Sequence, residues 1–501
     1  MKYETVIGLE IHAQLSTESK MFCSCSTKFG SKPNTNICPV CTGQPGVLPV
    51  TNKKAIELAI KTALALNCKI EPHSVFARKH YFYPDLPKDY QISQYELPLA
   101  TGGHLEIEVE GNPRKIGITR VHLEEDAGKL VHKGSDLPGR QAGRIMGAEE
   151  SLVDFNRTGV PLMEIVSEPD LRSPREAAVF MEALARLLEY IEVCDAKMEE
   201  GSLRCDANLS IRPMGSEEFG TKTEVKNMNS FKAVEKALMA EEKRHTETIE
   251  AGGYIVQETR FFDDVTETTT SMRSKEFAHD YRYFPEPDLV PIEPEEKWIS
   301  EIRKSIGELP EERKTRLVNN YSLSSSTASL LVEDRLKADC FERSSTLLLN
   351  KHPNQEQNKV KWSSKIANYI VGPVTACIVN EKKSSFAEYT SIPELIAEVI
   401  EHENDGTLSS SMGKEVLIKA ITSGKSAKDV IAESGLTQIS NEKELEQIIK
   451  DVIKNNPKPV EEYKKGKETA ITFLVGQVMK LSKGRANPKL ATDLLKQALN
   501  I

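Results

Sequence analysis

Apolar and polar residues alternate strictly from Val6 to Leu15, which predicts a β-strand with two unlike faces. The apolar face can be buried and carries Ile7, Leu9, Ile11, Ala13 and Leu15. The other face carries Glu10, His12 and Gln14, spaced about 7 Å apart along the strand. A carboxylate followed by an imidazole offers groups that bind metal or exchange protons, although a solvated sheet face explains the pattern equally well.

Two later segments alternate in the same way, residues 117–126 and 160–168. In the first, Val121, Leu123 and Glu125 share one face, and the opposite face carries Arg120, His122, Glu124 and Asp126, of which Glu124 is a candidate for cofactor binding. In the second, Glu164 lies between apolar neighbours on one face. Because a buried carboxylate is costly without a cation, Glu125 and Glu164 each need a partner.

An internal Arg or Lys would satisfy either carboxylate alone. Taken together, three strands favour a shared divalent cation, bound by His12, Glu125 and Glu164 with Glu10 close by. Such oxygen-rich ligands suit Mg²⁺ or Mn²⁺, and Mg²⁺ usually binds together with substrate phosphates. This predicts phosphoryl transfer. The chain lacks a Gly-x-x-x-x-Gly-Lys-Ser/Thr loop, so we expect a sheet to hold the nucleotide.

Three further polar segments are candidates for nucleotide binding. Arg204, Asp206 and Asn208 share one strand face, and Lys222, Glu224 and Lys226 share another. These faces could clamp a nucleotide, and a cross-strand ion-pair ladder explains them nearly as well. The segment from Arg78 to Gln91 joins aromatic rings to basic residues that include Lys79, which suits a base and a phosphate; a hydrophobic plug is the alternative.

Helical periodicity follows in two places, residues 55–66 and the segment opened by the capping box Ser173-Pro-Arg-Glu176. A proline-rich connector then ends the first domain. We expect a domain of residues 1–293, an all-helical domain of residues 294–406 and a helical tail of residues 407–501. The end of the tail is basic, which indicates nucleic-acid binding or a solvated helix face, and carries Lys464, Lys465, Lys467, Lys480, Lys483, Arg485, Lys489 and Lys496.

Cysteines cluster once among the nine of this 501-residue chain, as Cys23, Cys25, Cys38 and Cys41. The spacing predicts a closed structural zinc site, with four free thiols or a redox pair as alternatives. The net charge of −9 and the absence of a long apolar run predict a soluble cytoplasmic protein without a membrane span or signal peptide. Residues 134–150 suggest a substrate flap or a plain surface insertion.

Six long motifs together resemble the B subunits of aspartyl/glutamyl-tRNA(Asn/Gln) amidotransferases. The motifs are Gly8–Leu15, Arg78–Gln91, His122–Gly128, Leu162–Asp170, Glu200–Asn208 and Asp280–Asp288. The resemblance implies an α+β fold: a glutamine-synthetase-like cradle with a mainly antiparallel sheet, then a helical domain and a YqeY-like tail domain that binds tRNA.

The same resemblance implies a reaction. ATP phosphorylates the side-chain carboxylate of misacylated Glu-tRNA(Gln) or Asp-tRNA(Asn), and ammonia converts the acyl phosphate to the amide. The resemblance assigns His12, Glu125 and Glu164 to Mg²⁺, with Glu10 close by, in agreement with the strand faces. Ammonia would come from a separate amidase (glutaminase) subunit, with a small third subunit completing a heterotrimer. A non-enzymatic tRNA-binding scaffold and a metal-dependent phosphohydrolase remain the alternatives.

Overall fold

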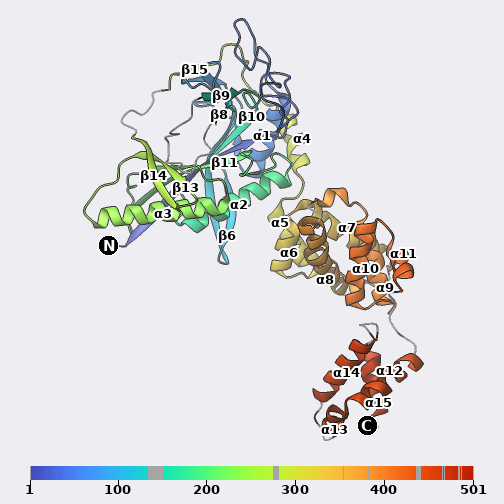
Figure 1. Cartoon of the computed structure of the whole chain (residues 1–501). Helices are drawn as coiled ribbons and strands as arrows, with labels where there is room; N and C mark the ends of the chain where they lie inside the picture. The colour runs from blue at the N-terminus through green and yellow to red at the C-terminus, as the bar shows by residue number, and fades with distance from the viewer. Residues whose placement is uncertain are drawn as a thin grey trace. The chain divides into compact units, whose positions relative to one another are not determined.

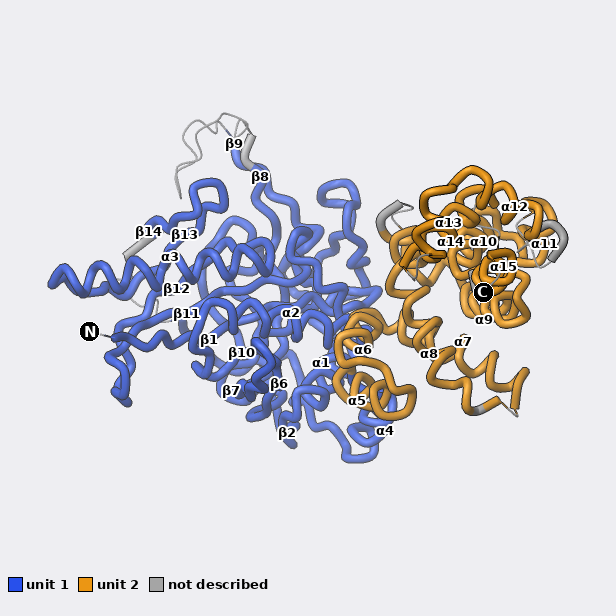
Figure 2. Tube along the Cα trace, turned by 90° about the horizontal axis from the view of Figure 1, so that it is seen from below, with its two compact units in different colours: residues 1–309 blue, residues 310–501 orange. Residues whose placement is uncertain are grey.

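The computed structural model divides the chain into two compact units, residues 1–309 and 310–501 (Figure 2). It describes every residue except 1, 134–149, 275–280, 354, 382–383, 436–441, 465–466, 468, 483–485, 487 and 500–501. The expected flap at 134–150 therefore lies almost wholly outside the described residues. None of the described helices is long and apolar enough to cross a membrane.

A ten-stranded sheet forms the centre of the first unit (Figure 1). Its strand order is β14-β13-β12-β11-β1-β10-β7-β5-β2, with β6 paired to β7. Its strands are β1 (Tyr3–Gln14), β2 (Lys69–Ile70), β5 (Ala100–Thr101), β6 (His104–Val109), β7 (Asn112–Glu125), β10 (Pro161–Ser167), β11 (Leu203–Pro213), β12 (Thr223–Lys226), β13 (Glu258–Asp263) and β14 (Thr268–Ser274). Only β12 and β13 run parallel among these pairs. The sheet is therefore mainly antiparallel, as expected.

The apolar face of β1 lies in the core of this unit, with Ile7, Ile11 and Ala13 fully buried. The helices in the same core are α1 (Lys53–Ala65), α2 (Pro174–Tyr190), α3 (Phe231–Glu250) and α4 (Glu296–Ile306). Helix α2 begins at the predicted capping box, where the Ser173 hydroxyl accepts from the Glu176 backbone N–H. Because these helices pack on the apolar side of β1, the polar side of the strand is available to bind ligands or to take part in a reaction.

Among its described residues, the first unit has two smaller sheets beside the ten-stranded one. One has the order β15-β3-β4, built from β3 (Ala77–His80), β4 (Tyr90–Ser93) and β15 (Tyr283–Pro285). The other pairs β8 (Lys129–Lys133) with β9 (Glu150–Asp154). The three-stranded sheet arises from the predicted aromatic and basic segment, which joins a distant part of the chain through β15.

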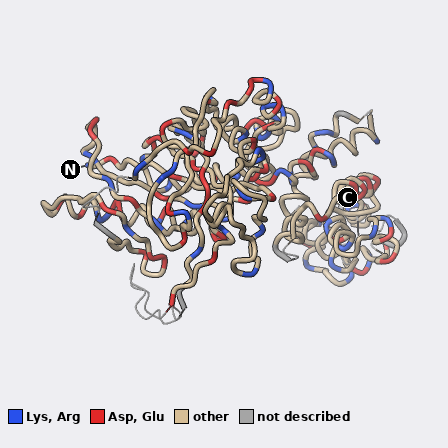
Figure 3. Tube along the Cα trace, turned by 90° about the horizontal axis from the view of Figure 1, so that it is seen from above, with Lys and Arg blue, Asp and Glu red and all other residues tan. Residues whose placement is uncertain are grey.

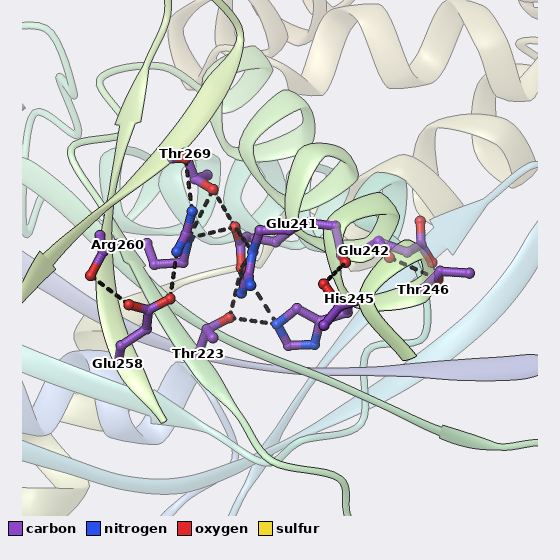
Figure 4. Close-up of polar contacts among 11 residues, drawn as sticks. Thr223, Glu241, Glu242, His245, Thr246, Glu258, Arg260 and Thr269 are labelled. Atoms are coloured by element: carbon purple, nitrogen blue, oxygen red, sulfur yellow. Dashed lines mark hydrogen bonds and ion pairs between the residues drawn. The ribbon is translucent and has the colours of Figure 1, made fainter. Parts of the chain in front are cut away.

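A buried carboxylate joins α3 to the far edge of the large sheet. Glu241 is fully buried and accepts from Thr223 Oγ1 at 2.9 Å and from Arg244 Nη2 at 2.7 Å. Arg260 Nε on β13 lies 2.9 Å from the same carboxylate (Figure 4). Burial favours the neutral acid, but hydrogen bonds from His245, Arg244 and Thr269 outweigh it and lower the pKa of Glu241 far below its ordinary value.

The described part of the second unit is helical, and its buried apolar residues form two clusters. Its α-helices are α5 (Pro310–Tyr321), α6 (Ser325–Val332), α7 (Arg335–Lys351), α8 (Lys359–Tyr369), α9 (Ile392–Asn404), α10 (Ser410–Ser423), α11 (Ala427–Ser434), α12 (Glu442–Asn455), α13 (Pro457–Lys464), α14 (Thr469–Leu481) and α15 (Pro488–Ala498). Short helical turns cover Glu356–Asn358, Ile370–Val374, Ala376–Glu381 and Phe386–Glu388. Both signs of charge are distributed over both units (Figure 3).

Clusters of buried apolar residues span the expected boundaries at 293 and 406. Ile299 and Ile302 of α4 belong to the core of the first unit, so that unit extends past the proline-rich connector. The first helical cluster runs from Leu317 to Ile431 and includes residues of α10 and α11. The second cluster begins at Leu445. Apolar contacts therefore extend across both expected boundaries.

Replacement of Glu241 by Gln should lower the free energy of unfolding of the first unit by about 3 kcal/mol, because the buried carboxylate that Arg244 and Arg260 share loses its charge and Arg260 keeps only Glu258 as a charged partner among the described residues. Glu247→Gln, on the exposed side of the same helix, serves as the control and should change it little. Denaturant unfolding of the full chain measures both. Equal stability of the two variants would contradict a central role for Glu241.

Candidate active site and its family

The register of three adjacent strands gathers the predicted polar side chains into rows. His12 on β1 lies directly opposite Glu164 on β10, and Glu164 lies opposite His122 on β7. Leu162 pairs with Glu124 two positions further along. Since paired residues of antiparallel strands point to the same side, His12, Glu164, His122 and Glu124 share the polar face of the sheet.

Three of these side chains converge on one point. Nε2 of His12 lies 3.3 Å from Oε2 of Glu164 and 3.9 Å from Oε2 of Glu124. One ligand atom from each of the three residues lies within 4.8 Å of the others. Glu124 and Glu164 are buried, while His12 keeps some exposure. Two carboxylates and an imidazole in this arrangement fit a divalent cation of the Mg²⁺ or Mn²⁺ type.

A second imidazole, that of His122, contacts both carboxylates of the group formed by His12, Glu124 and Glu164. Its Nε2 lies 3.3 Å from Oε1 of Glu124 and 3.4 Å from Oε2 of Glu164. Burial lowers the pKa of His122, but the two carboxylates outweigh it and raise that pKa to about 9. A protonated His122 therefore balances part of the negative charge. The sequence analysis placed His122 on this face but did not include it in the site.

The charges of the group are strongly interdependent. Burial opposes ionisation of Glu164, but hydrogen bonds with His12 and His122 outweigh it and lower the pKa of Glu164. Burial raises the pKa of Glu124, but His122, and more weakly Lys79, hold it below its ordinary value. Both carboxylates are therefore ionised at neutral pH and available as ligands.

Strand β4 of the small sheet contacts Glu124 directly. Ser93 Oγ donates to Oε1 of Glu124 at 2.7 Å, and Gln91 Nε2 donates to Oε2 at 3.1 Å. These bonds fix the direction of the carboxylate toward His12. Gln91 was predicted only as the end of the aromatic and basic segment, and Ser93 was not predicted, because their role depends on contacts across more than thirty positions of the chain.

Glu125 lies outside this group, although the sequence analysis assigned it to the metal site. Alternation along β7 turns Glu125 to the opposite side of the strand from Glu124. There the Lys88 ammonium pairs with it, and the Ile92 backbone N–H donates to Oε1 at 2.9 Å. The structure therefore brings Glu124, and not Glu125, to His12 and Glu164.

The remaining predicted site residues surround the group without joining it. Glu10 accepts from Nδ2 of Asn208 at 3.0 Å. Arg204 donates to Asp126 at 2.6 Å, and Asp206 pairs with the Lys226 ammonium. The pairs Arg204–Asp126 and Asp206–Lys226 support the interpretation of these polar faces as ion pairs. Arg204 lies opposite His12 in the register of β1 and β11.

Comparisons with known proteins identify the family. Residues 5–300 match the family described as the GatB/GatE catalytic domain, and residues 355–499 match the GatB domain. The aspartyl/glutamyl-tRNA(Asn/Gln) amidotransferase B subunit of Thermodesulfovibrio yellowstonii is 52% identical over 99% of both chains. Those of Moorella thermoacetica and Brevibacillus brevis are 52% and 50% identical over the whole chain. The chain belongs to the B-subunit family of these amidotransferases.

A second possible metal site of this family member is formed by the four clustered cysteines. The sulfur atoms of Cys23, Cys25, Cys38 and Cys41 lie within 4.8 Å of one another. The backbone N–H of Cys38 donates to the sulfur of Cys41 at 3.2 Å, and Lys20 Nζ lies 3.5 Å from it. The contact with Cys23, aided by these donors, lowers the pKa of Cys41, which favours a thiolate. The arrangement fits a closed tetrahedral zinc site.

Cys25→Ser should abolish tight zinc binding, because three thiolates leave the tetrahedral site open. Zinc content of the purified chain, measured by atomic emission, should fall from about one ion per chain to near zero. Cys68→Ser, a buried cysteine outside the cluster, is the matched control and should retain the metal. A wild-type chain without zinc after purification in zinc-containing buffer would contradict the assignment.

Proposed function

We propose that this chain is the subunit that activates and amidates misacylated tRNA in a glutamine-dependent amidotransferase. In this proposal, the first unit is a cradle related to glutamine synthetase. It uses ATP to phosphorylate the side-chain carboxylate of Glu-tRNA(Gln) or Asp-tRNA(Asn), and ammonia then yields Gln-tRNA(Gln) or Asn-tRNA(Asn). The observation that carries the proposal is the convergence of His12, Glu124 and Glu164 on one face of the sheet.

These three residues would hold Mg²⁺. When bound, Mg²⁺ would supply positive charge between the γ-phosphate of ATP and the substrate carboxylate, which would otherwise repel each other. The imidazole of His12 would have to be neutral to serve as a ligand, so binding of the ion would be coupled to loss of the His12 proton. The contacts from Ser93, Gln91 and His122 keep the ligand atoms in place before substrates arrive.

ATP has a candidate site beside the group, further along β1. A cavity there is lined on the strand face by Gly8, Glu10 and Asn208, and further out by Phe219 and Lys222. Glu10 is two residues from His12 on the same face, about 7 Å away. We therefore infer that the triphosphate runs along β1 toward the metal group, with Lys222 near its charges and the exposed Phe219 ring available to the base.

The chemistry needs protection from water as well as charge. A carboxylate is a poor electrophile, and phosphorylation converts it to a mixed anhydride with phosphate as the leaving group. The burial of Glu124 and Glu164 limits solvent at the point where this anhydride would form. Ammonia would come from the amidase (glutaminase) subunit, and a small third subunit would complete the heterotrimer.

The tail is proposed to bind tRNA. Its described basic residues Lys464, Lys480 and Lys496 are exposed, whereas Lys467 also pairs with Glu462. The predicted Lys465, Lys483 and Arg485 lie outside the described residues, as does the side chain of Lys489. Contacts between such lysines and the phosphates of the tRNA would supply affinity without selecting a nucleotide sequence.

Glu124→Gln should weaken Mg²⁺ binding more than about 10-fold in the presence of a non-hydrolysable ATP analogue, since it removes a charged ligand. Glu125→Gln is the matched control on the adjacent residue. It should keep the Mg²⁺ affinity but unfold at lower temperature, because the buried Lys88 ammonium loses its partner. Calorimetric titration and thermal unfolding of the full chain measure the two effects.

The same pair distinguishes the proposal from a tRNA-binding scaffold. In the assembled complex, Glu124→Gln should abolish ATP-dependent phosphorylation of the aminoacyl group while misacylated tRNA still binds. Undiminished phosphorylation would refute the metal assignment. Mg²⁺-independent binding of the nucleotide to the wild-type chain would favour the scaffold.

A chain that ends at Gly435 should bind tRNA more weakly and with a shallower salt dependence. The slope should fall by about 1 for each lost phosphate contact. Ammonia-dependent ATP use by the cradle should survive, because the first helical cluster ends at Ile431 and stays whole. Filter binding at several salt concentrations tests the first point. Identical affinity and salt slope in the full and shortened chains would contradict it.

A further inference from the structure

One face of the small sheet β15-β3-β4 looks onto the carboxylate group. Gln91 on β4 pairs directly with Lys79 on β3, and Lys79 pairs directly with Tyr283 on β15. Residues paired in this way point to the same side of a sheet. Because Gln91 on that side donates to Glu124, Lys79 and Tyr283 also point toward the site.

Tyrosine side chains extend this face in a continuous row. Tyr81 and Tyr281 lie two residues from Lys79 and Tyr283, and their rings meet edge to face at 5.8 Å between centroids. Centroid distances continue at 6.5 Å from Tyr281 to Tyr283 and at 6.3 Å from Tyr81 to Tyr83. Tyr95 stacks on Tyr283 at 4.2 Å. We call Tyr83, Tyr81, Tyr281, Tyr283 and Tyr95 the tyrosine row.

The tyrosine row is open to solvent at three of its rings, half-buried at Tyr81 and Tyr283, and carries a cation. Tyr83 is 55% exposed, Tyr95 49% and Tyr281 37%. The Lys79 Nζ lies 5.0 Å from the ring centroid of Tyr281 and 5.7 Å from that of Tyr81. Accessible aromatic rings beside a Lys ammonium are what the end of a single-stranded nucleic acid requires, because its bases stack and its phosphates need a positive charge.

We propose that the tyrosine row stacks the 3′-terminal nucleoside of the misacylated tRNA. The inference rests on the proposed function. The amino acid is esterified to the ribose of that nucleoside, so its side-chain carboxylate is only a few bonds away. A carboxylate placed at Glu124 and His12 therefore needs the terminal base on a surface that borders them, and the tyrosine row is such a surface. ATP has the cavity at Glu10 and Lys222, on the other flank.

Charge arrangement supports this choice of occupant. The group on the sheet face contains two carboxylates, partly balanced by Arg120 and His122, whereas Lys79 supplies a positive charge among the rings. The last phosphodiester of the tRNA would lie next to Lys79 while the base lies on Tyr281 and Tyr283. Stacking accepts any base, so this surface positions the substrate end and does not select among tRNAs.

The test uses the assembled amidotransferase and a tRNA whose terminal adenine is replaced by 2-aminopurine, a base whose fluorescence is quenched by stacking. Wild type should quench the probe on binding. The double variant Tyr281→Leu, Tyr283→Leu should lose the quenching and raise the KM for misacylated tRNA by about 5- to 100-fold. The KM for ATP should stay the same. The double variant with Phe at both positions keeps the rings and should retain both readouts.

Full quenching by the leucine double variant, or a rise in the KM for ATP alone, would overturn the proposal. Thermal unfolding checks that the double variant folds. Tyr83→Leu, at the exposed end of the row, is a second variant for the same two measurements and should destabilise the fold less. Quenching needs no ATP turnover, so its failure is distinct from failure of the proposed function, which would appear as wild-type protein that binds tRNA without phosphorylating it.

Discussion

The site depends on the antiparallel hydrogen-bond register of β1, β10 and β7. This register sets His12 opposite Glu164 and Glu164 opposite His122, so side chains from remote parts of the chain meet without any flexible loop. Like charges held this close would repel. The two imidazoles relieve that repulsion, and burial strengthens every interaction among them. The backbone hydrogen bonds between these strands thus offset the free-energy cost of holding the like charges close together.

Alternation along single strands predicted much of this arrangement. The polar face of β1, the position of Glu164 and the cluster of four cysteines all followed from local patterns that hold whatever the strand pairs with. The mainly antiparallel sheet and the helical second unit are also confirmed. The same alternation places Glu124 on the same face as His122. The free-energy cost of burying a carboxylate, however, led to the prediction of Glu125 as the metal ligand.

Contacts between remote residues could not be predicted in this way. Lys88 satisfies Glu125, Arg260 satisfies Glu241, and Ser93 orients Glu124, each across a separation that no periodicity encodes. The limits of the compact units differ from the expected boundaries for a similar reason. A proline-rich connector marks a break in secondary structure, whereas a unit ends where apolar packing ends, and Ile299 packs beyond the connector.

Glu124 and Glu125 are joined by one peptide unit and lie on opposite sides of β7. Glu124 lies beside His12 and Glu164. Glu125 faces Lys88 and the cavity that Cys23 and Cys41 also line. The thickness of a single strand separates the two environments. A change on the Lys88 side of the strand therefore acts on the same stretch of backbone that positions Glu124.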